Sequence, residues 1–255
     1  MVERLVTAVH EISPDVVVVS GDLTQRARPV EFEEARLFLD RLPKPQIVIP
    51  GNHDVPLHNI YSRFWRGLDA YQKYICQDLE PFFSDGQIAI VGVNTARRLT
   101  IKSGRINQAQ IDRVEEQLCG LSNEIKKIVV THHPFDLPAH YQKDALVGRA
   151  TKAMARFARC RIDLLLAGHL HLSFSGPTAI RYDAAGHSAI FVQAGTACST
   201  RSRGEPNSFN VILLEQDLIT VQTFSAEQAE AFELRSTQGF CRSPNGWIAS
   251  VMRPE

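Results

Sequence analysis

Four short apolar segments, each followed at once by polar side chains, place the strongest constraint on how this chain folds. The first is residues 16–19, four consecutive valines that Gly21 and Asp22 follow. Such a run, bounded by proline and glycine, is typical of a strand buried on both faces of a parallel sheet. The other three segments are residues 47–50, 128–131 and 162–167, and Asn, Asp or His follows each of them. Because the carboxyl ends of parallel strands meet at one edge of a sheet, we expect these polar side chains to form one site.

Helical periodicity fills the intervals between these strands. Residues 2–12 and 30–42 each carry an apolar stripe at helical spacing, and a further helix is expected over residues 150–158. Asn107 with Gln110 three residues later resembles a capping box, which predicts another helix toward Gly120. These helices have the length of the crossover connections that join parallel strands.

The remaining segments predict a second, β-rich part. Short strands are expected there over residues 189–192, 209–214 and 218–224, and one further strand, over residues 88–93, belongs to the first part. Two further segments are less regular: residues 55–85 are rich in aromatic side chains and are expected to be helices covering one rim of the site, and residues 225–255 stay unassigned. The whole pattern predicts one α/β domain over residues 1–255, with two sheets stacked face to face and helices outside.

Composition narrows the classes of partner and compartment. Lys and Arg number 28 and Asp and Glu number 28, so the net charge near zero predicts no nucleic-acid polymer as the partner. The five cysteines are scattered and form no Cys-x-x-Cys pair, so we interpret them as core or surface thiols in a reducing compartment. No apolar run approaches the roughly 20 residues that span a bilayer, and no signal peptide is evident. We therefore expect a cytoplasmic protein with no membrane contact, whereas the oligomeric state stays open.

The polar residues at the strand ends have the donor atoms of a metal site. In extended chain His169 and His171 lie on the same side, so they can bind one metal ion or two adjacent ions. His132 and His133 are neighbours and are expected to face opposite ways, so only one of them is expected to be a ligand. Asp22 can bridge two cations and Asn52 offers a neutral amide oxygen. Nitrogen and oxygen donors without a thiolate favour Mn, Fe, Zn or Co.

Each of these motifs alone has a purely structural explanation. An aspartate after glycine often caps a helix, and a histidine in a loop is often satisfied by a backbone group. Four such motifs in one order, each after a strand, favour a metal site over chance.

The segments GDLTQRA, GNHD, THHP and GHLH resemble the signature blocks of the calcineurin-like metallophosphoesterases, and most closely their bacterial cyclic-nucleotide phosphodiesterase-like branch. The resemblance covers residues 16 to about 215 and implies a four-layer α/β/β/α sandwich of two mixed sheets flanked by helices. It implies that a small phosphodiester or phosphomonoester is hydrolysed by a hydroxide that bridges two metal ions.

The resemblance also assigns a role to each candidate residue. Asp22 would bridge the two metal ions, and Asn52, His132 and His169 would complete the shell of the second ion. His171 would belong to the first ion. His53 would contact the substrate phosphate and protonate or stabilise the leaving oxygen. For Asp54 two roles stay open, which are to orient His53 or to bind backbone amides.

One departure from the family pattern concerns the first metal ion. The family begins with a strand that ends in Asp-x-His and supplies two ligands to that ion, and no such motif precedes Asp22. We expect that the start codon of Met1 lies inside the true gene; otherwise the chain is a weakened or single-metal relative. A catalytically silent binding module that keeps the metal-site scaffold is therefore the alternative function.

Overall fold

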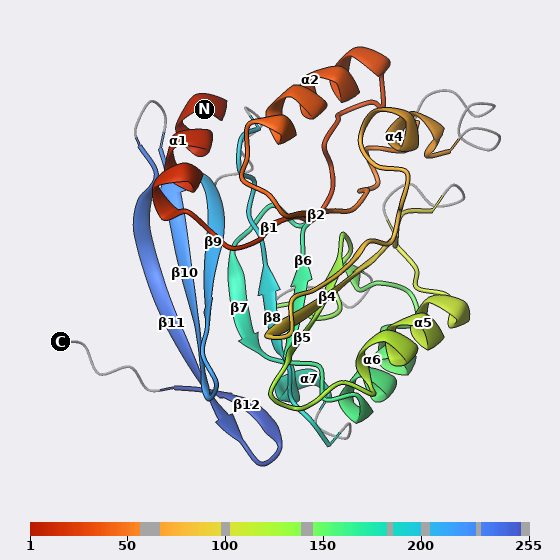
Figure 1. Ribbon diagram of the computed structural model, residues 1–255, viewed down its shortest axis with the longest axis vertical. Helices are drawn as coiled ribbons and strands as arrows, with labels where there is room; N and C mark the ends of the chain where they lie inside the picture. Colours follow the sequence, from red (N-terminus) through yellow and green to blue (C-terminus); the bar gives the residue numbers. More distant parts are fainter. Residues whose placement is uncertain are drawn as a thin grey trace.

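The computed structural model describes residues 1–56, 67–97, 103–138, 145–182, 186–199, 205–227 and 231–250 (Figure 1). Its helices are α1 (Val2–Ile12), α2 (Pro29–Asp40), α4 (Asp69–Tyr74), α5 (Gln108–Leu118), α6 (Ala150–Arg159) and α7 (Ala179–Tyr182). Its strands are β1 (Val17–Val19), β2 (Gln46–Val48), β3 (Phe82–Ser84), β4 (Ile88–Val93), β5 (Lys126–Thr131), β6 (Leu164–Ala167), β7 (Phe174–Pro177), β8 (Ile190–Gln193), β9 (Asn207–Leu214), β10 (Leu218–Ala226), β11 (Glu233–Ser243) and β12 (Gly246–Ala249).

A six-stranded mixed sheet positions half of the candidate site. Its strand order is β3-β4-β5-β6-β8-β7, in which β4, β5, β6 and β8 run parallel and β3 and β7 are antiparallel edges. Thr131 at the end of β5 pairs with Ala167 at the end of β6. The Gly168 amide then donates to the His132 carbonyl at 3.1 Å. The register therefore brings the two histidine-bearing strand ends side by side.

The other half of the site follows a separate parallel pair, β1 and β2. Val19 pairs with Val48, and the Ile49 amide donates to the Val19 carbonyl at 3.1 Å. Helices α1, α2 and α4 cover one face of this pair through a cluster that includes Val6, Phe32 and Tyr71. The chain thus leaves both strands at the same level, with Asp22 beside Asn52.

Two apolar layers bury the faces of the six-stranded sheet. On one face α5 and α6 contribute Val114 and Phe157 to a cluster with Val129 and Phe191. On the other face, residues of β5, β6 and β8 share a cluster with residues of β10, β11 and β12, so the two sheets face each other. The expected mixed α/β fold is confirmed, and the four-layer order stays a prediction.

The second sheet is antiparallel, with the order β12-β11-β10-β9 (blue in Figure 1). Two of its strands, β11 and β12, lie within residues 225–255, to which the sequence pattern assigned no structure. The side chains of Glu233–Ser236 on β11 are all exposed, so the alternation that marks a half-buried strand is missing there. The hydrogen-bonded pairing with β10 holds β11 in extended form instead.

Most expected elements are confirmed, some to the residue. The boundaries of α1 and β4 are those expected, and Asn107 and Gln110 form a reciprocal capping box with two hydrogen bonds of 2.9 Å. Among the described residues of the aromatic segment 55–85 are the six-residue helix α4, as expected, and the strand β3, which was not expected. Three of its aromatic side chains, Tyr61, Phe64 and Trp65, lie outside the described residues.

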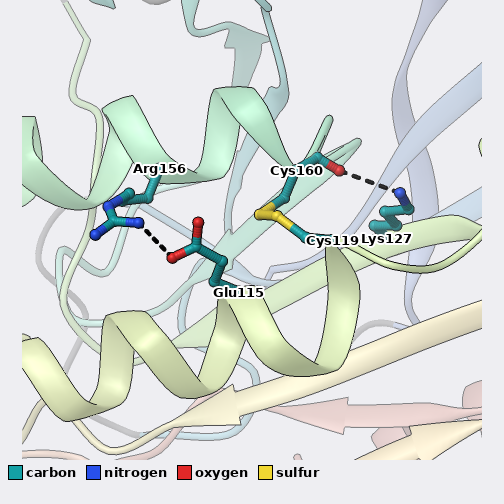
Figure 2. The surroundings of a disulfide bond; sticks show 5 residues. All are labelled: Glu115, Cys119, Lys127, Arg156 and Cys160. Atoms are coloured by element: carbon teal, nitrogen blue, oxygen red, sulfur yellow. Dashed lines mark hydrogen bonds and ion pairs between the residues drawn. A yellow bond between two sulfur atoms is a disulfide. The ribbon is translucent and has the colours of Figure 1, made fainter.

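The interpretation of all five cysteines as thiols is wrong for two of them. Cys119 and Cys160 form a disulfide that links the C-terminal cap of α5 to that of α6 (Figure 2). The two helices pack side by side on the sheet and end at the same level, so residues 41 positions apart meet. The inference of a reducing compartment depended on all five cysteines being free thiols, so the Cys119–Cys160 disulfide removes its support.

Within the described residues, no helix has the length and apolar character needed to cross a membrane.

Candidate metal centre

Four side chains from four strand ends converge on one point. Asn52 Oδ1 lies 2.9 Å from His132 Nε2 and 2.9 Å from His169 Nδ1. The two imidazole nitrogens are 3.3 Å apart, and Asp22 Oδ1 is 3.3 Å from His132 Nε2. We call Asp22, Asn52, His132 and His169 the four-residue cluster. Although 147 positions separate its first and last members, their donor atoms share one small volume.

The orientation of His132 shows which atom it presents to the cluster. Its Nδ1 lies 2.7 Å from the carbonyl of Ser20, and a carbonyl can only accept a hydrogen bond. The proton of the neutral ring is therefore on Nδ1, which leaves the lone pair of Nε2 facing Asn52 Oδ1. A backbone carbonyl that fixes the tautomer in this way is a common feature around metal-ligating histidines.

The spacing of the four donors fits a cation between them. Transition-metal bonds to nitrogen and oxygen are about 2.0–2.2 Å long, so neighbouring ligands are about 2.8–3.6 Å apart at octahedral or tetrahedral angles. The separations of 2.9–3.3 Å in the cluster match that range. Two lone pairs that face each other at 2.9 Å repel unless a positive charge lies between them. The donor set is therefore suited to Mn, Fe, Zn or Co.

The electrostatics of the cluster also favour positive charge. Burial by itself would raise the pKa of Asp22, but the charge of His132 and the amide of His53 outweigh burial and hold that pKa well below 3.8. Burial by itself would lower the pKa of His132, but the charge of Asp22 outweighs it and raises that pKa above 6.5. A proton or a metal ion between these side chains would stabilise the arrangement.

Two glycines make the approach of β1 and β2 possible. A Cβ on Gly21 would lie 2.6 Å from the Gly51 nitrogen and 2.8 Å from His132 Nδ1, and Gly21 also has φ of +96°. A Cβ on Gly51 would overlap the backbone nitrogen and the carboxylate of Asp22. Because Gly51 has no Cβ, it leaves room for Asp22 at this place.

Backbone strain gathers at the same edge of the sheet. Asp22, His169 and His171 have φ of +57°, +77° and +60°, in the left-handed region that non-glycine residues seldom adopt. Such strain persists only where the surrounding structure enforces it, and it is common at functional sites. All three residues are candidate ligands from the sequence.

Asp54 binds backbone amides, which is one of the two roles that the sequence left open for it. Its carboxylate accepts from the amides of Leu23, Thr24 and Gly51 at 3.3, 2.9 and 2.8 Å, and from the Thr24 hydroxyl at 3.0 Å. Burial and the nearby charge of Asp22 raise the pKa of Asp54 to about 6. The side chain is fully buried, and it ties the end of β1 to the end of β2.

His53 stands next to the cluster without joining it. Its amide donates to Asp22 Oδ1 at 3.0 Å, and its ring Nδ1 donates to the Gln25 carbonyl at 3.0 Å. With Nδ1 occupied in this way, Nε2 is the nitrogen that can take up or release a proton. This position agrees with the role expected for His53, which stays a prediction.

His171 departs from the expected geometry. The sequence predicted that residues 169–171 are extended, so that both histidines lie on one side. Both residues are instead left-handed, so the alternation of an extended chain does not apply. His171 Nδ1 lies 2.7 Å from Thr196 Oγ1, whereas His169 contacts Asn52. A role for His171 at a first metal ion stays a prediction.

The expectation that His132 and His133 face opposite ways is wrong. Their ring centroids are 4.9 Å apart, and the His133 ring lies 4.6 Å from that of His169. Side chains alternate only within a strand, and β5 ends at Thr131. The ligand atoms of His132, His133 and His169 all lie within 4.8 Å of one another.

His133 is therefore a further candidate ligand beside His132, whereas alternation predicted only one of the two. Its Nδ1 lies 2.8 Å from Thr95 Oγ1, which comes from the loop after β4. The sequence held a signal for it, because His133 directly follows the same strand end as His132. Nothing in the sequence pattern singled out Thr95, since its contact with His133 spans 38 residues.

Two phosphatases are among the solved structures with a similar fold. A purple acid phosphatase from yellow lupin (Lupinus luteus) seeds aligns over 97% of this chain and 48% of its own, with a TM-score of 0.68 and 10% identity. A dimetal phosphatase from Danio rerio aligns over 87% of this chain and 85% of its own, with a TM-score of 0.62 and 15% identity. The class that these comparisons define is a mixed α/β fold shared with phosphatases.

Sequence comparison narrows the class to a family. A model of the calcineurin-like phosphoesterase family matches residues 2–173, which is most of the chain. The chain belongs to the calcineurin-like phosphoesterase family.

Curated relatives share this region at low identity. A probable cyclic nucleotide phosphodiesterase of Synechococcus sp. is 28% identical over 169 residues, which are 64% of this chain and 60% of that protein. The 3',5'-cyclic adenosine monophosphate phosphodiesterase of Escherichia coli is 21% identical over 168 residues, or 64% of this chain and 56% of that protein. The similarity thus spans about three fifths of the length of these relatives.

Proposed function

We propose that this protein is a metal-dependent phosphoesterase that hydrolyses a small phosphodiester. The observation that carries the proposal is the convergence of Asp22, Asn52, His132 and His169, whose donor atoms have the spacing of ligands around one transition-metal ion. Membership of the calcineurin-like phosphoesterase family supports the same reaction. The names of the relatives from Synechococcus sp. and Escherichia coli favour a diester, such as a cyclic nucleotide, over a monoester.

The four-residue cluster would hold one ion, and Asp22 and His171 would contribute ligands to a second. When bound, the metal lowers the pKa of a water molecule and neutralises charge that develops on the phosphate. Binding of a second ion is a separate part of the proposal, because Asp22 and His171 alone would not complete the coordination shell of that ion.

The side chains of this chain divide the remaining work. His53 would protonate the leaving oxygen through Nε2, since Gln25 already binds its Nδ1. The hydrogen bond from the His53 amide to Asp22 fixes the distance between this acid and the cluster. Asp54, through the amides at the ends of β1 and β2, keeps Asn52 and Asp22 in place without contacting the substrate.

Metal content and hydrolysis by matched variants test the proposal. The purified chain is stripped with a chelator and reloaded with Mn, Fe, Zn or Co. Bound metal is then measured by elemental mass spectrometry, and bis(p-nitrophenyl) phosphate and p-nitrophenyl phosphate are offered as diester and monoester. N52A and H169A each remove a donor, and H10A removes an exposed histidine on α1 as a control.

We expect the reloaded protein to hydrolyse the diester faster than the monoester. N52A and H169A should lose both metal and activity by more than the 10- to 100-fold typical of outer-shell changes, and H10A should lose neither. H53A should keep its metal while kcat falls by about 10²- to 10⁴-fold. Full activity in both N52A and H169A would overturn the proposal. A metal-loaded protein that cleaves neither ester would favour the binding module.

A further inference from the structure

A second polar hollow lies at the opposite edge of the six-stranded sheet from the four-residue cluster. Its lining comes from the segments that precede β5, β6 and β8 and from the β11–β12 hairpin, and it includes Asn123, Arg161, Asp163, His187, Arg242 and Trp247. Because β5, β6 and β8 are parallel, residues before these strands lie at the edge away from the strand ends that carry the histidines. One strand length, on the order of 15 Å, separates the two places.

Positive charge exceeds negative charge in the lining. Two guanidinium groups, those of Arg161 and Arg242, face one carboxylate, that of Asp163. Asp163 is already well satisfied, since it accepts from the Lys127 amide at 2.9 Å and from Trp247 Nε1 at 2.8 Å. Asp217, outside the lining, is a second carboxylate near Arg242, whereas no carboxylate of the described residues lies within ion-pair distance of the Arg161 guanidinium.

Arg242 has hydrogen-bond donors to spare. Its Nη1 donates to the Asn123 carbonyl at 3.2 Å, whereas its Nε and Nη2 are buried and have no hydrogen-bond partner in the described part of the chain. Asp163 lies 3.7 Å from Nη2 and Asp217 lies 3.5 Å from Nε, at the distance of ion pairs and beyond a good hydrogen bond. The Arg242 guanidinium also lies 5.1 Å from the ring of Trp247, which helps to hold it in one orientation.

Arg161 occupies a left-handed backbone position that arginine seldom adopts. It follows the C-terminal cap of α6 with φ of +55°. The Arg161 and Ile162 amides donate to the carbonyls of Ala158 and Phe157, both at 3.1 Å, which is the Schellman pattern. Glycine or asparagine is usual at this left-handed position. The left-handed conformation is unfavourable for an arginine, so a role for the Arg161 side chain would explain why arginine is present at this position.

We propose that this hollow binds a small phosphate-like anion, either inorganic phosphate or the terminal phosphoryl group of a small metabolite. The enclosed space is about 10 Å³, on the scale of one water molecule, so an anion would lie at the open mouth of the hollow. Guanidinium forks match phosphate oxygens in pairs. The guanidinium donors of Arg161 and Arg242 suit an anion with four oxygens better than a planar carboxylate with two, whereas His187 donates through Nε2 to the Ile162 carbonyl at 3.1 Å.

Phosphate binding to the full-length, metal-loaded protein tests the proposal. Equilibrium dialysis with radiolabelled phosphate gives stoichiometry and Kd, and hydrolysis of bis(p-nitrophenyl) phosphate in parallel reports on the metal centre. R161N removes one guanidinium and places a residue that accepts positive φ, so its Tm should equal or exceed that of the unchanged protein. R242K keeps the charge and loses the fork. R159N, at an exposed position on α6, is the matched control.

We expect one phosphate per chain at the hollow, with Kd at least tenfold weaker in R161N and R242K and unchanged in R159N. Hydrolysis at the metal centre should be the same in R161N and R159N, which separates this site from the proposed active site. A phosphomonoester such as glycerol phosphate should compete with labelled phosphate if a terminal phosphoryl group is the natural ligand, and should fail to compete if free phosphate is. Equal phosphate binding in R161N, R242K and R159N, or competition by acetate as strong as by phosphate, would overturn the proposal.

Discussion

Gly51 offers the sharpest test of how the candidate metal centre is assembled. In G51A the new Cβ would overlap the backbone nitrogen of Asp22 and lie 2.9 Å from its Cγ. Ordinary contact begins near 3.4 Å, so the Asp22 side chain must move by at least about 0.5 Å, and the overlap with the backbone nitrogen requires more. A change of rotamer cannot relieve this, because one of the overlapping atoms belongs to the backbone. We expect the ends of β1 and β2 to separate.

The consequences of G51A can be measured separately for stability and activity. Overpacking of this kind costs about 1–3 kcal/mol in the free energy of unfolding, which urea denaturation measures. A displacement approaching 1 Å at a reacting centre can cost about 100-fold in rate, so we expect diester hydrolysis to fall at least tenfold.

The matched control is G120A, because a Cβ on Gly120 meets nothing within 4 Å. That variant should be unchanged or slightly more stable, since alanine restricts the unfolded chain. If G51A is as stable and as active as G120A, the close approach of Gly51 to Asp22 does not govern the site.

Three further predictions address the parts of the structure that support the site. D54N should lower the free energy of unfolding by about 2–5 kcal/mol in urea, because an amide leaves two of the four donors around Asp54 without an acceptor; a loss under 0.5 kcal/mol would contradict this. R181Q should destabilise by about 2–4 kcal/mol at pH 7, because the buried Asp136 loses its ion pair. Burial raises the pKa of Asp136 above 3.8, so its ionised form costs stability at neutral pH, and the R181Q deficit should shrink as the pH falls toward 3.8; an unchanged deficit would speak against it. Reduction of the Cys119–Cys160 disulfide, which closes a loop of 41 residues, should cost about 4 kcal/mol in urea denaturation with dithiothreitol, and dithiothreitol should have no effect on a C119A/C160A double variant.

The sequence by itself determined the elements whose signals are local. The stripe of Val2–Ile12, the capping box at Asn107 and the β-branched run before Gly21 each depend on residues within one or two helical turns. The order of strand ends that carry Asp, Asn and His also predicted which residues would meet. Asp22, Asn52 and His169 were expected from that order, and the resemblance to the phosphoesterases selected His132 over His133.

The tertiary structure decided what depends on partners distant in the chain. The exposed first half of β11 gives no periodic signal, and β10 holds it extended. The pairing of Cys119 with Cys160 required α5 and α6 to end at one level. The directions expected for the side chains of His133 and His171 were wrong because alternation holds only inside a strand, and both residues lie beyond one. Local propensity fixes an element, but the direction of a side chain in a loop follows from contacts that only the folded chain brings together.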